Sequence, residues 1–132
     1  MSEKPTVDDE RASFATYDAI AATLHTYIEG ARTGDGALMR TAFLDAAHIR
    51  GSYAGKPTDW SLPEFCDLID KHGPAADVVA QIVMIEHSGT AAAARLEAEN
   101  WRGTRYSDFF LLLKQGSEWR IASKVFFAHS RA

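Results

Sequence analysis

The sequence of 132 residues contains a single cysteine and no long apolar run, and each absence excludes a class of protein. With Cys66 alone, no disulfide can form within the chain, which excludes a small secreted scaffold held together by disulfides. No run approaches the ~18 consecutive apolar residues that a membrane-spanning helix needs. The polar segment 1–11 also lacks the apolar centre of a signal peptide. We therefore expect a cytoplasmic protein that does not contact a membrane.

Concentrated positive charge is also missing. Lysine and arginine together number 14 against 18 acidic residues, and they form no run or stripe, so the net charge is −4. Proteins that bind nucleic acid or anionic membranes carry such a stripe, so we expect neither as a partner. The five histidines show no close metal-ligand spacing, and Gly51–Gly55 lacks the lysine of a phosphate-binding loop. No metal and no cofactor are expected.

The composition fits an ordinary globular protein, with 46% apolar and 24% charged residues. The length favours one domain. Residues 1–12 are polar, so we expect a flexible arm there, followed by a single domain over residues 13–132.

The first half of this domain has helical patterns. Apolar residues recur at three- and four-residue steps from Thr16 to Arg32. Asp35 is placed to cap a short second helix over residues 37–43. A third helix is predicted to begin at the Ser61–Glu64 capping box and to end before Pro74.

Strand patterns dominate the second half. After a short strand within residues 43–53 and a loop over residues 54–60, β-branched or alternating runs occupy residues 78–88 and 90–101. Two more runs, residues 106–114 and 119–127, flank a polar turn. Helices followed by successive antiparallel strands indicate an α+β fold.

The last two runs each carry one charge among apolar residues, Asp108 and Lys124. A five-residue loop over residues 114–118 would place Leu113 opposite Trp119 and Asp108 directly opposite Lys124. We favour this register because it keeps two apolar sets on one face, where they can pack together. These sets are Phe109, Leu111 and Leu113 on one strand, and Trp119, Ile121 and Val125 on the other.

The two charges have two interpretations that the sequence leaves open. They form a cross-strand ion pair worth roughly 0.2–1 kcal/mol that fixes the register. Alternatively, Asp108 is a general base and Lys124 holds a ligand anion, in an aromatic setting.

Three segments together resemble a known superfamily. They are the long helix followed by Gly-Asp and a short helix, the turn Phe43–Ala47, and the ending Asp108–Phe126. The sequence resembles the nuclear transport factor 2-like superfamily, also called SnoaL-like, and its ending is most similar to the putative lumazine-binding subgroup. The resemblance covers residues 15–129.

The resemblance implies a cone-shaped α+β fold, in which three N-terminal helices pack on a strongly curved antiparallel sheet around a pocket. It implies a homodimer formed through the outer sheet face. It also implies binding of a small apolar or aromatic molecule, or cofactor-independent catalysis of the isomerase or dehydratase kind, in an apolar pocket. The alternative is a non-catalytic ligand-binding or structural dimeric domain, with Asp108 and Lys124 at the dimer interface. The substrate and the reaction stay open.

Candidate residues follow from this pocket. The candidates for proton transfer are Asp108, His48 and His25; the alternative for His48 is a place on the surface, and the alternative for His25, which the sequence favours, is a structural role on the first helix. The candidates for ligand binding are Tyr17, Tyr27, Trp60, Phe65, Trp101, Tyr106, Phe110, Lys124 and Phe126. Cys66 is either a nucleophile or a small filler on the third helix.

Overall fold

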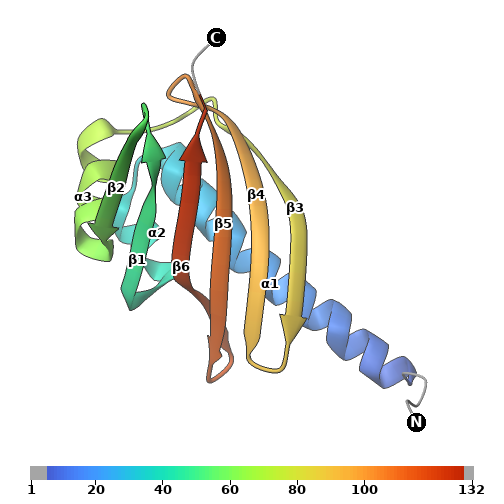
Figure 1. The fold of residues 1–132 in the computed structure, drawn as a ribbon. Coiled ribbons are helices and arrows are strands. Elements are labelled where there is room, and N and C mark those ends of the chain that lie inside the picture. Colours follow the sequence, from blue (N-terminus) through green and yellow to red (C-terminus); the bar gives the residue numbers. More distant parts are fainter. Residues whose placement is uncertain (1–5, 130–132) are drawn as a thin grey trace.

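Three helices pack against one face of a six-stranded curled sheet in a computed structural model of the chain (Figure 1). The structure describes residues 6–129, with only the backbone described for residues 8–10. This arrangement confirms the predicted α+β class and the placing of the helices on a curved sheet.

The helices are α1 (Val7–Thr33), α2 (Gly36–Thr41) and α3 (Leu62–His72). Their predicted caps are confirmed. The Asp35 side chain accepts from the Leu38 amide at 3.0 Å, and Ser61 and Glu64 form a reciprocal capping box at the start of α3.

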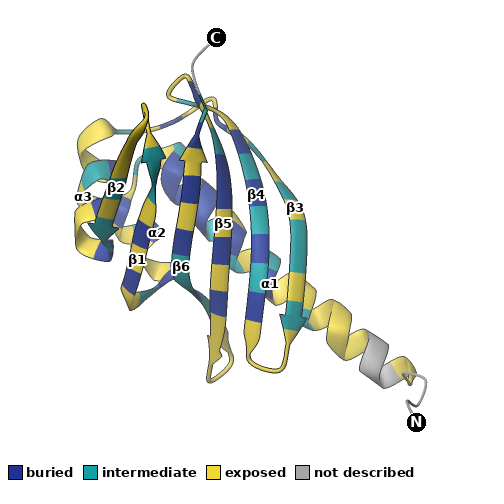
Figure 2. Ribbon diagram, viewed as in Figure 1, coloured by how far each residue is buried: buried dark blue, intermediate teal, exposed yellow. Residues whose placement is uncertain are grey.

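Helix α1 begins earlier than the sequence suggested. Residues 7–12 were expected in a flexible arm but form its first turns, whereas residues 1–5 of that arm lie outside the described residues. The N-terminal half of α1 extends past the sheet and is exposed (Figures 1 and 2). No sheet lies against it there, which explains why the apolar spacing marks only the later part of the helix.

The strands are β1 (Phe43–Tyr53), β2 (Lys56–Ser61), β3 (Val79–Ser88), β4 (Ala91–Trp101), β5 (Thr104–Gln115) and β6 (Glu118–Ala128). They lie in the order β2-β1-β6-β5-β4-β3. The expectation of a wholly antiparallel sheet is wrong, because β1 and β6 pair in parallel. The chain crosses over through α3 to the far edge, and the meander from β3 to β6 then returns beside β1.

The predicted loop over residues 54–60 is also wrong, because most of it forms strand β2. Gly55 and Pro57 suggested a loop over residues 54–60, but residues 56–61 pair with β1. Proline is tolerated there because β2 is an edge strand with one neighbour, so its missing amide hydrogen leaves no second ladder incomplete.

The hairpin between β5 and β6 has a two-residue turn and a bulge in place of the predicted five-residue loop. Gln115 pairs with Glu118, and Ala122 is an extra residue between the pairs formed by Ser123 and Ile121. Before the bulge Ile121 is buried, and after it Lys124 is buried, so the alternation reverses at Ala122.

This bulge decides which residues face the helices. Asp108 lies opposite Phe126 and Phe110 lies opposite Lys124, so the predicted direct pairing of Asp108 with Lys124 is wrong by two positions. Both charged side chains nevertheless point to the same inner face, as diagonal neighbours.

The predicted apolar face of β5 is also wrong. Phe109, Leu111 and Leu113 are 46%, 59% and 40% exposed on the outer face of the sheet, which the helices leave uncovered. The core lies on the inner face, where Phe110 and Leu112 of β5 belong to one buried cluster with residues of α1.

Candidate functional site

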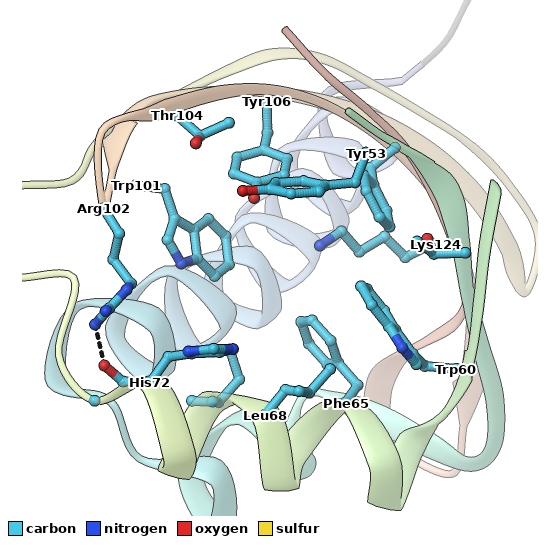
Figure 3. A pocket seen from close by; sticks show the side chains of 14 residues that line it. Tyr53, Trp60, Phe65, Leu68, His72, Trp101, Arg102, Thr104, Tyr106 and Lys124 are labelled. Carbon is cyan, nitrogen blue, oxygen red and sulfur yellow. Dashed lines mark hydrogen bonds between the residues drawn. The ribbon is translucent and has the colours of Figure 1, made fainter. Parts of the chain in front are cut away.

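A cavity of about 340 Å³ lies between α3, the inner face of the sheet and the turn joining β4 to β5 (Figure 3). This volume suits a small organic molecule. The cavity is lined by Tyr53, Thr58, Trp60, Phe65, Leu68, Ile69, His72, Gly73, Trp101, Arg102, Thr104, Tyr106, Lys124 and Phe126.

Packed aromatic rings form much of the cavity wall. The Trp60 ring stacks on that of Phe126 with centroids 5.9 Å apart, and on that of Phe65 at 6.3 Å. Trp101 and Tyr106 meet edge to face at 5.5 Å. Because each ring is held by another ring, the wall has its shape before a ligand enters, and flat apolar molecules fit its chemistry.

Lys124 reaches into this cavity from β6, and Figure 3 shows its amine directed toward the interior. Only 3% of the side chain is exposed. The Nζ atom lies 4.8–5.3 Å from the centroids of four rings, which belong to Phe65, Tyr27, Phe126 and Trp101. Such rings stabilise a cation through their negative faces but give it no hydrogen-bond acceptor.

Asp108 lies behind Lys124 and is fully buried. Its Oδ2 accepts a hydrogen bond of 3.0 Å from the Tyr27 hydroxyl, and its Oδ1 lies 3.9 Å from Lys124 Nζ. Among the groups that the structure describes, Oδ1 has no hydrogen-bond partner. We refer to Tyr27, Asp108 and Lys124 as the buried cluster.

Burial shifts the proton equilibria of all three groups. It raises the pKa of Asp108, against the opposing effects of Lys124 and of the Tyr27 hydrogen bond. It lowers the pKa of Lys124, with Asp108 opposing, and it raises the pKa of Tyr27 well above the usual value, with Asp108 adding to the rise. Burial therefore shifts both members of the ion pair toward their neutral forms.

Polar groups lie at the outer end of the cavity. His72 and Arg102 are exposed, and the Arg102 guanidinium donates to the His72 carbonyl oxygen, which ties the β4–β5 turn to the end of α3 (Figure 3). The cavity therefore runs from a polar mouth to an aromatic interior that ends at an amine.

The structure gathers most of the predicted ligand-binding residues around the cavity. Those that line it are Trp60, Phe65, Trp101, Tyr106, Lys124 and Phe126. Tyr27 and Phe110 lie in the core beside it, with their rings 5.1 Å apart. Tyr17 does not line it and is 43% exposed on α1.

The candidate proton-transfer residues are not brought together. Asp108 reaches the cavity only through Lys124. His25 is exposed on α1, and His48 is exposed on β1, where its Nδ1 lies 3.3 Å from Asp59. Neither histidine lines the cavity.

Cys66 has no sign of a reactive thiol. It is buried on α3, and burial raises its pKa to about 11. The thiolate, which is the nucleophile, is therefore rare near neutral pH, and the interpretation as a small filler fits better.

Several lining residues were not found from the sequence. Thr58 was missed because β2 was taken for a loop, and Tyr53, at the end of β1, because the strand that pairs with it was not recognised. Arg102 sits in a turn with a φ of 52°, and His72 was assigned only to the end of a helix. Turns that are distant along the chain meet here through tertiary structure, which leaves no local pattern.

The part of the chain that the structure describes has neither a membrane-spanning helix nor a cluster of metal ligands. No helix within residues 6–129 has the length and apolar content to cross a membrane. No three histidine, cysteine, aspartate or glutamate side chains of the described set gather as metal ligands would.

Comparison with known proteins gives a consistent fold. The family model described as putative lumazine-binding matches residues 15–127. A crystal structure of a nuclear transport factor 2-like protein of unknown function from Methylobacillus flagellatus KT is 38% identical, with a TM-score of 0.83, covering 98% of this chain and 99% of that one. A protein of the same description from Shewanella baltica OS155 is 34% identical, with a TM-score of 0.82, covering 96% and 99%.

One curated protein carries an activity in its name. Aldolase FrzH from a Cladobotryum species is 28% identical over 116 residues, which are 87% of this chain and 93% of that protein. A ketosteroid isomerase-like protein from Erwinia carotovora atroseptica is 17% identical with a TM-score of 0.66, covering 86% and 95%, and this likeness concerns the fold alone.

Proposed function

Because the chain belongs to the putative lumazine-binding family of nuclear transport factor 2-like proteins, we propose that its cavity binds a small apolar or aromatic molecule and catalyses proton transfer beside a carbonyl group, without a cofactor. The observation that carries the proposal is the buried cluster, whose amine ends an otherwise aromatic cavity. Isomerisation, dehydration and aldol addition of carbonyl compounds share this step, the removal of a proton from the carbon next to the carbonyl.

The cluster supports this chemistry through its proton equilibria. Lys124 touches whatever occupies the cavity, and burial lowers its pKa, so its neutral form can accept a proton from carbon. Asp108 Oδ1 lies 3.9 Å behind it and would hold the resulting ammonium group. Tyr27 fixes the carboxyl group by donating to Oδ2. Tyr27 is thus a positioning residue, whereas Lys124 and Asp108 form the acid–base pair of the site.

The comparison with aldolase FrzH adds support, because that protein is named for a reaction that begins with this proton transfer. The aromatic wall restricts the substrate class to molecules with a flat apolar part, and the polar mouth at His72 and Arg102 accommodates a polar end. The isomerase or dehydratase activity expected from the sequence falls within the same proposal.

Deuterium exchange tests the proposal without knowledge of the natural substrate. Phenylacetone is incubated with the protein in deuterium oxide, and loss of the proton signal beside its carbonyl is followed by nuclear magnetic resonance. We expect the exposed-lysine variant Lys114→Met to match the wild type and Lys124→Met to lose roughly 100-fold in exchange rate, the lower end of general-base contributions. Equal rates in the two variants would overturn the proposal.

A non-catalytic binding protein is the second candidate, and the same cavity supports it. Benzyl alcohol binding, followed through the fluorescence of Trp60 and Trp101, separates the two candidates. Binding together with enzyme-dependent exchange supports catalysis, whereas binding without exchange supports a binding protein.

We also propose a homodimer formed through the outer sheet face. Five large apolar side chains are exposed on the adjacent strands β5 and β6: Phe109, Leu111, Leu113, Val125 and Phe127. Exposed apolar patches often mark protein interfaces. Asp108 and Lys124 face the opposite side, so the alternative in which they serve assembly gains no support from their burial. The cytoplasmic location stays a prediction, which microscopy of a tagged protein would test.

A further inference from the structure

We propose that Lys124 forms a covalent iminium bond with an aldehyde or ketone bound in the cavity. This inference rests on the proposed function and deepens it, because it names the reactive group of the substrate, makes the amine a nucleophile and passes the removal of the C–H proton to Asp108. Three features of the site support it: access to the amine, the freedom of its nitrogen, and a neighbouring proton carrier.

Access distinguishes Lys124 from the other lysines that the structure describes. Lys56, Lys71 and Lys114 are exposed to solvent, whereas Lys124 is 3% exposed and lines the cavity. A carbonyl compound that enters between Trp60 and Trp101 meets this nitrogen at the end of the cavity (Figure 3). Water around the nitrogen is limited by the same rings, which protects an iminium bond from hydrolysis.

The nitrogen is free to react. Its neighbours are four ring faces at 4.8–5.3 Å and one carboxylate oxygen at 3.9 Å, which is beyond hydrogen-bonding distance. Within residues 6–129, the amine donates no hydrogen bond that would have to break before attack. Burial favours the neutral amine, the form that carries the nucleophilic lone pair.

Asp108 supplies the proton transfers that the reaction needs. The amine lone pair attacks the carbonyl carbon, a C–N bond forms, and the carbonyl electron pair moves to oxygen. A proton leaves nitrogen and another reaches that oxygen, which gives a carbinolamine with no net change in protons. The C–O bond then breaks, water leaves with a proton donated by the Asp108 carboxyl group, and the iminium forms. The carboxylate left behind is paired with the iminium charge and can remove the adjacent C–H proton to give an enamine.

The position of Asp108 Oδ1 suits this role. Tyr27 occupies Oδ2, whereas Oδ1 is directed toward Lys124 and has no other partner among the described groups. Burial raises the pKa of this carboxyl group, so it can carry a proton at a pH where an exposed aspartate cannot. Oδ2 is thus held by Tyr27, whereas Oδ1 is available to the reacting nitrogen.

Reductive trapping tests the inference on the intact protein. Benzaldehyde is added with cyanoborohydride near neutral pH, and the adduct is located by mass spectrometry of peptides. Benzaldehyde has no proton beside its carbonyl, so the reaction stops at the iminium and its reduced product. The labelled lysine is heavier than the free lysine by the mass of the aldehyde less one oxygen atom. We expect Lys124 to be labelled at least about tenfold faster than Lys56, Lys71 and Lys114, because the cavity holds the aldehyde beside its amine.

Two variants and one independent assay make the outcome decisive. Lys124→Arg keeps a cation without a nucleophilic amine and should lose the dominant adduct, whereas Lys114→Arg should keep it. Labelling confined to the exposed lysines of the wild type overturns the inference even if Lys124→Arg does not fold. Phenylacetone exchange without a Lys124 adduct leaves the proposed function standing and removes the covalent step. A Lys124 adduct without phenylacetone exchange supports the covalent step and contradicts the proposed proton transfer.

Discussion

The ion pair of the buried cluster gives a prediction about stability that can be worked out from its burial. Replacing Asp108 by asparagine keeps the size of the side chain and an oxygen that can accept from Tyr27, but removes the carboxylate that lies 3.9 Å from Lys124 Nζ. Lys124 is 3% exposed, so its charge would be left buried and uncompensated. Breaking a buried ion pair in this way costs about 3–5 kcal/mol of unfolding free energy.

The double variant Asp108→Asn, Lys124→Met is the matched control. A methionine fills similar volume among Phe65, Trp101 and Phe126 without a charge, and replacing a buried pair by apolar groups is often neutral or stabilising by about 1–4 kcal/mol. The double variant should therefore be more stable than Asp108→Asn alone, although it carries one more substitution.

The assay is urea denaturation followed by tryptophan fluorescence at neutral pH. The loss in Asp108→Asn should shrink as the pH rises, because burial lowers the pKa of Lys124 and the folded state then binds fewer protons than the unfolded state. A loss below about 1 kcal/mol, or a double variant less stable than the single one, would refute the argument that burial dominates this pair.

Three further predictions concern the wild type, the cavity and the outer face. Between about pH 4 and the raised pKa of Asp108, unfolding free energy should fall as pH rises, since the folded state holds the extra proton there; a urea midpoint that rises instead contradicts the shift. Trp60→Ala removes the ring stacked on Phe126 and should weaken benzyl alcohol binding at least about tenfold, and the lost stacking of about 0.5–1.5 kcal/mol is part of the cause. Titration with benzyl alcohol, followed by Trp101 fluorescence, measures the affinity, and an unchanged affinity contradicts the prediction. Leu111→Lys puts a charge into the exposed patch and should convert a dimer to a monomer in light scattering, with Lys114→Glu outside the apolar set as the control; a wild-type monomer would contradict the proposed interface.

The fold was predictable where local chemistry and tertiary structure agree. The caps at Asp35 and Ser61 and the alternation of Ala94, Leu96 and Ala98 each depend on a few neighbouring residues, and all were confirmed. The resemblance carried by the ending Asp108–Phe126 was also confirmed by the family model and by the related structures.

The site was less predictable because one extra residue controls it. Ala122 reverses the alternation of buried and exposed side chains along β6. The residue types of Ile121, Ala122 and Ser123 give no signal that would predict a bulge. Without it, Lys124 would share a face with Ala122 and point away from the side that buries Ile121. The sequence indicated that Asp108 and Lys124 belong together, but only the bulge explains why both point inward.

The mouth of the cavity could not be predicted from the sequence for a different reason. His72 ends a helix and Arg102 lies in a turn thirty positions later, and their contact depends on where the sheet edge meets α3. The first strand pair was likewise hidden by Pro57, which is compatible with an edge strand as well as with a loop. Such long-range placements leave no periodic signal in a single sequence.

Titration of the lysine side chains by nuclear magnetic resonance tests the central claim most directly, because it reports the amine in the cavity itself. With Lys124→Met to assign its signal, we expect Lys124 to titrate below the usual range of a lysine side chain and its signal to shift when benzyl alcohol fills the cavity. A Lys124 signal that titrates in the usual lysine range and does not change with the alcohol would contradict the account.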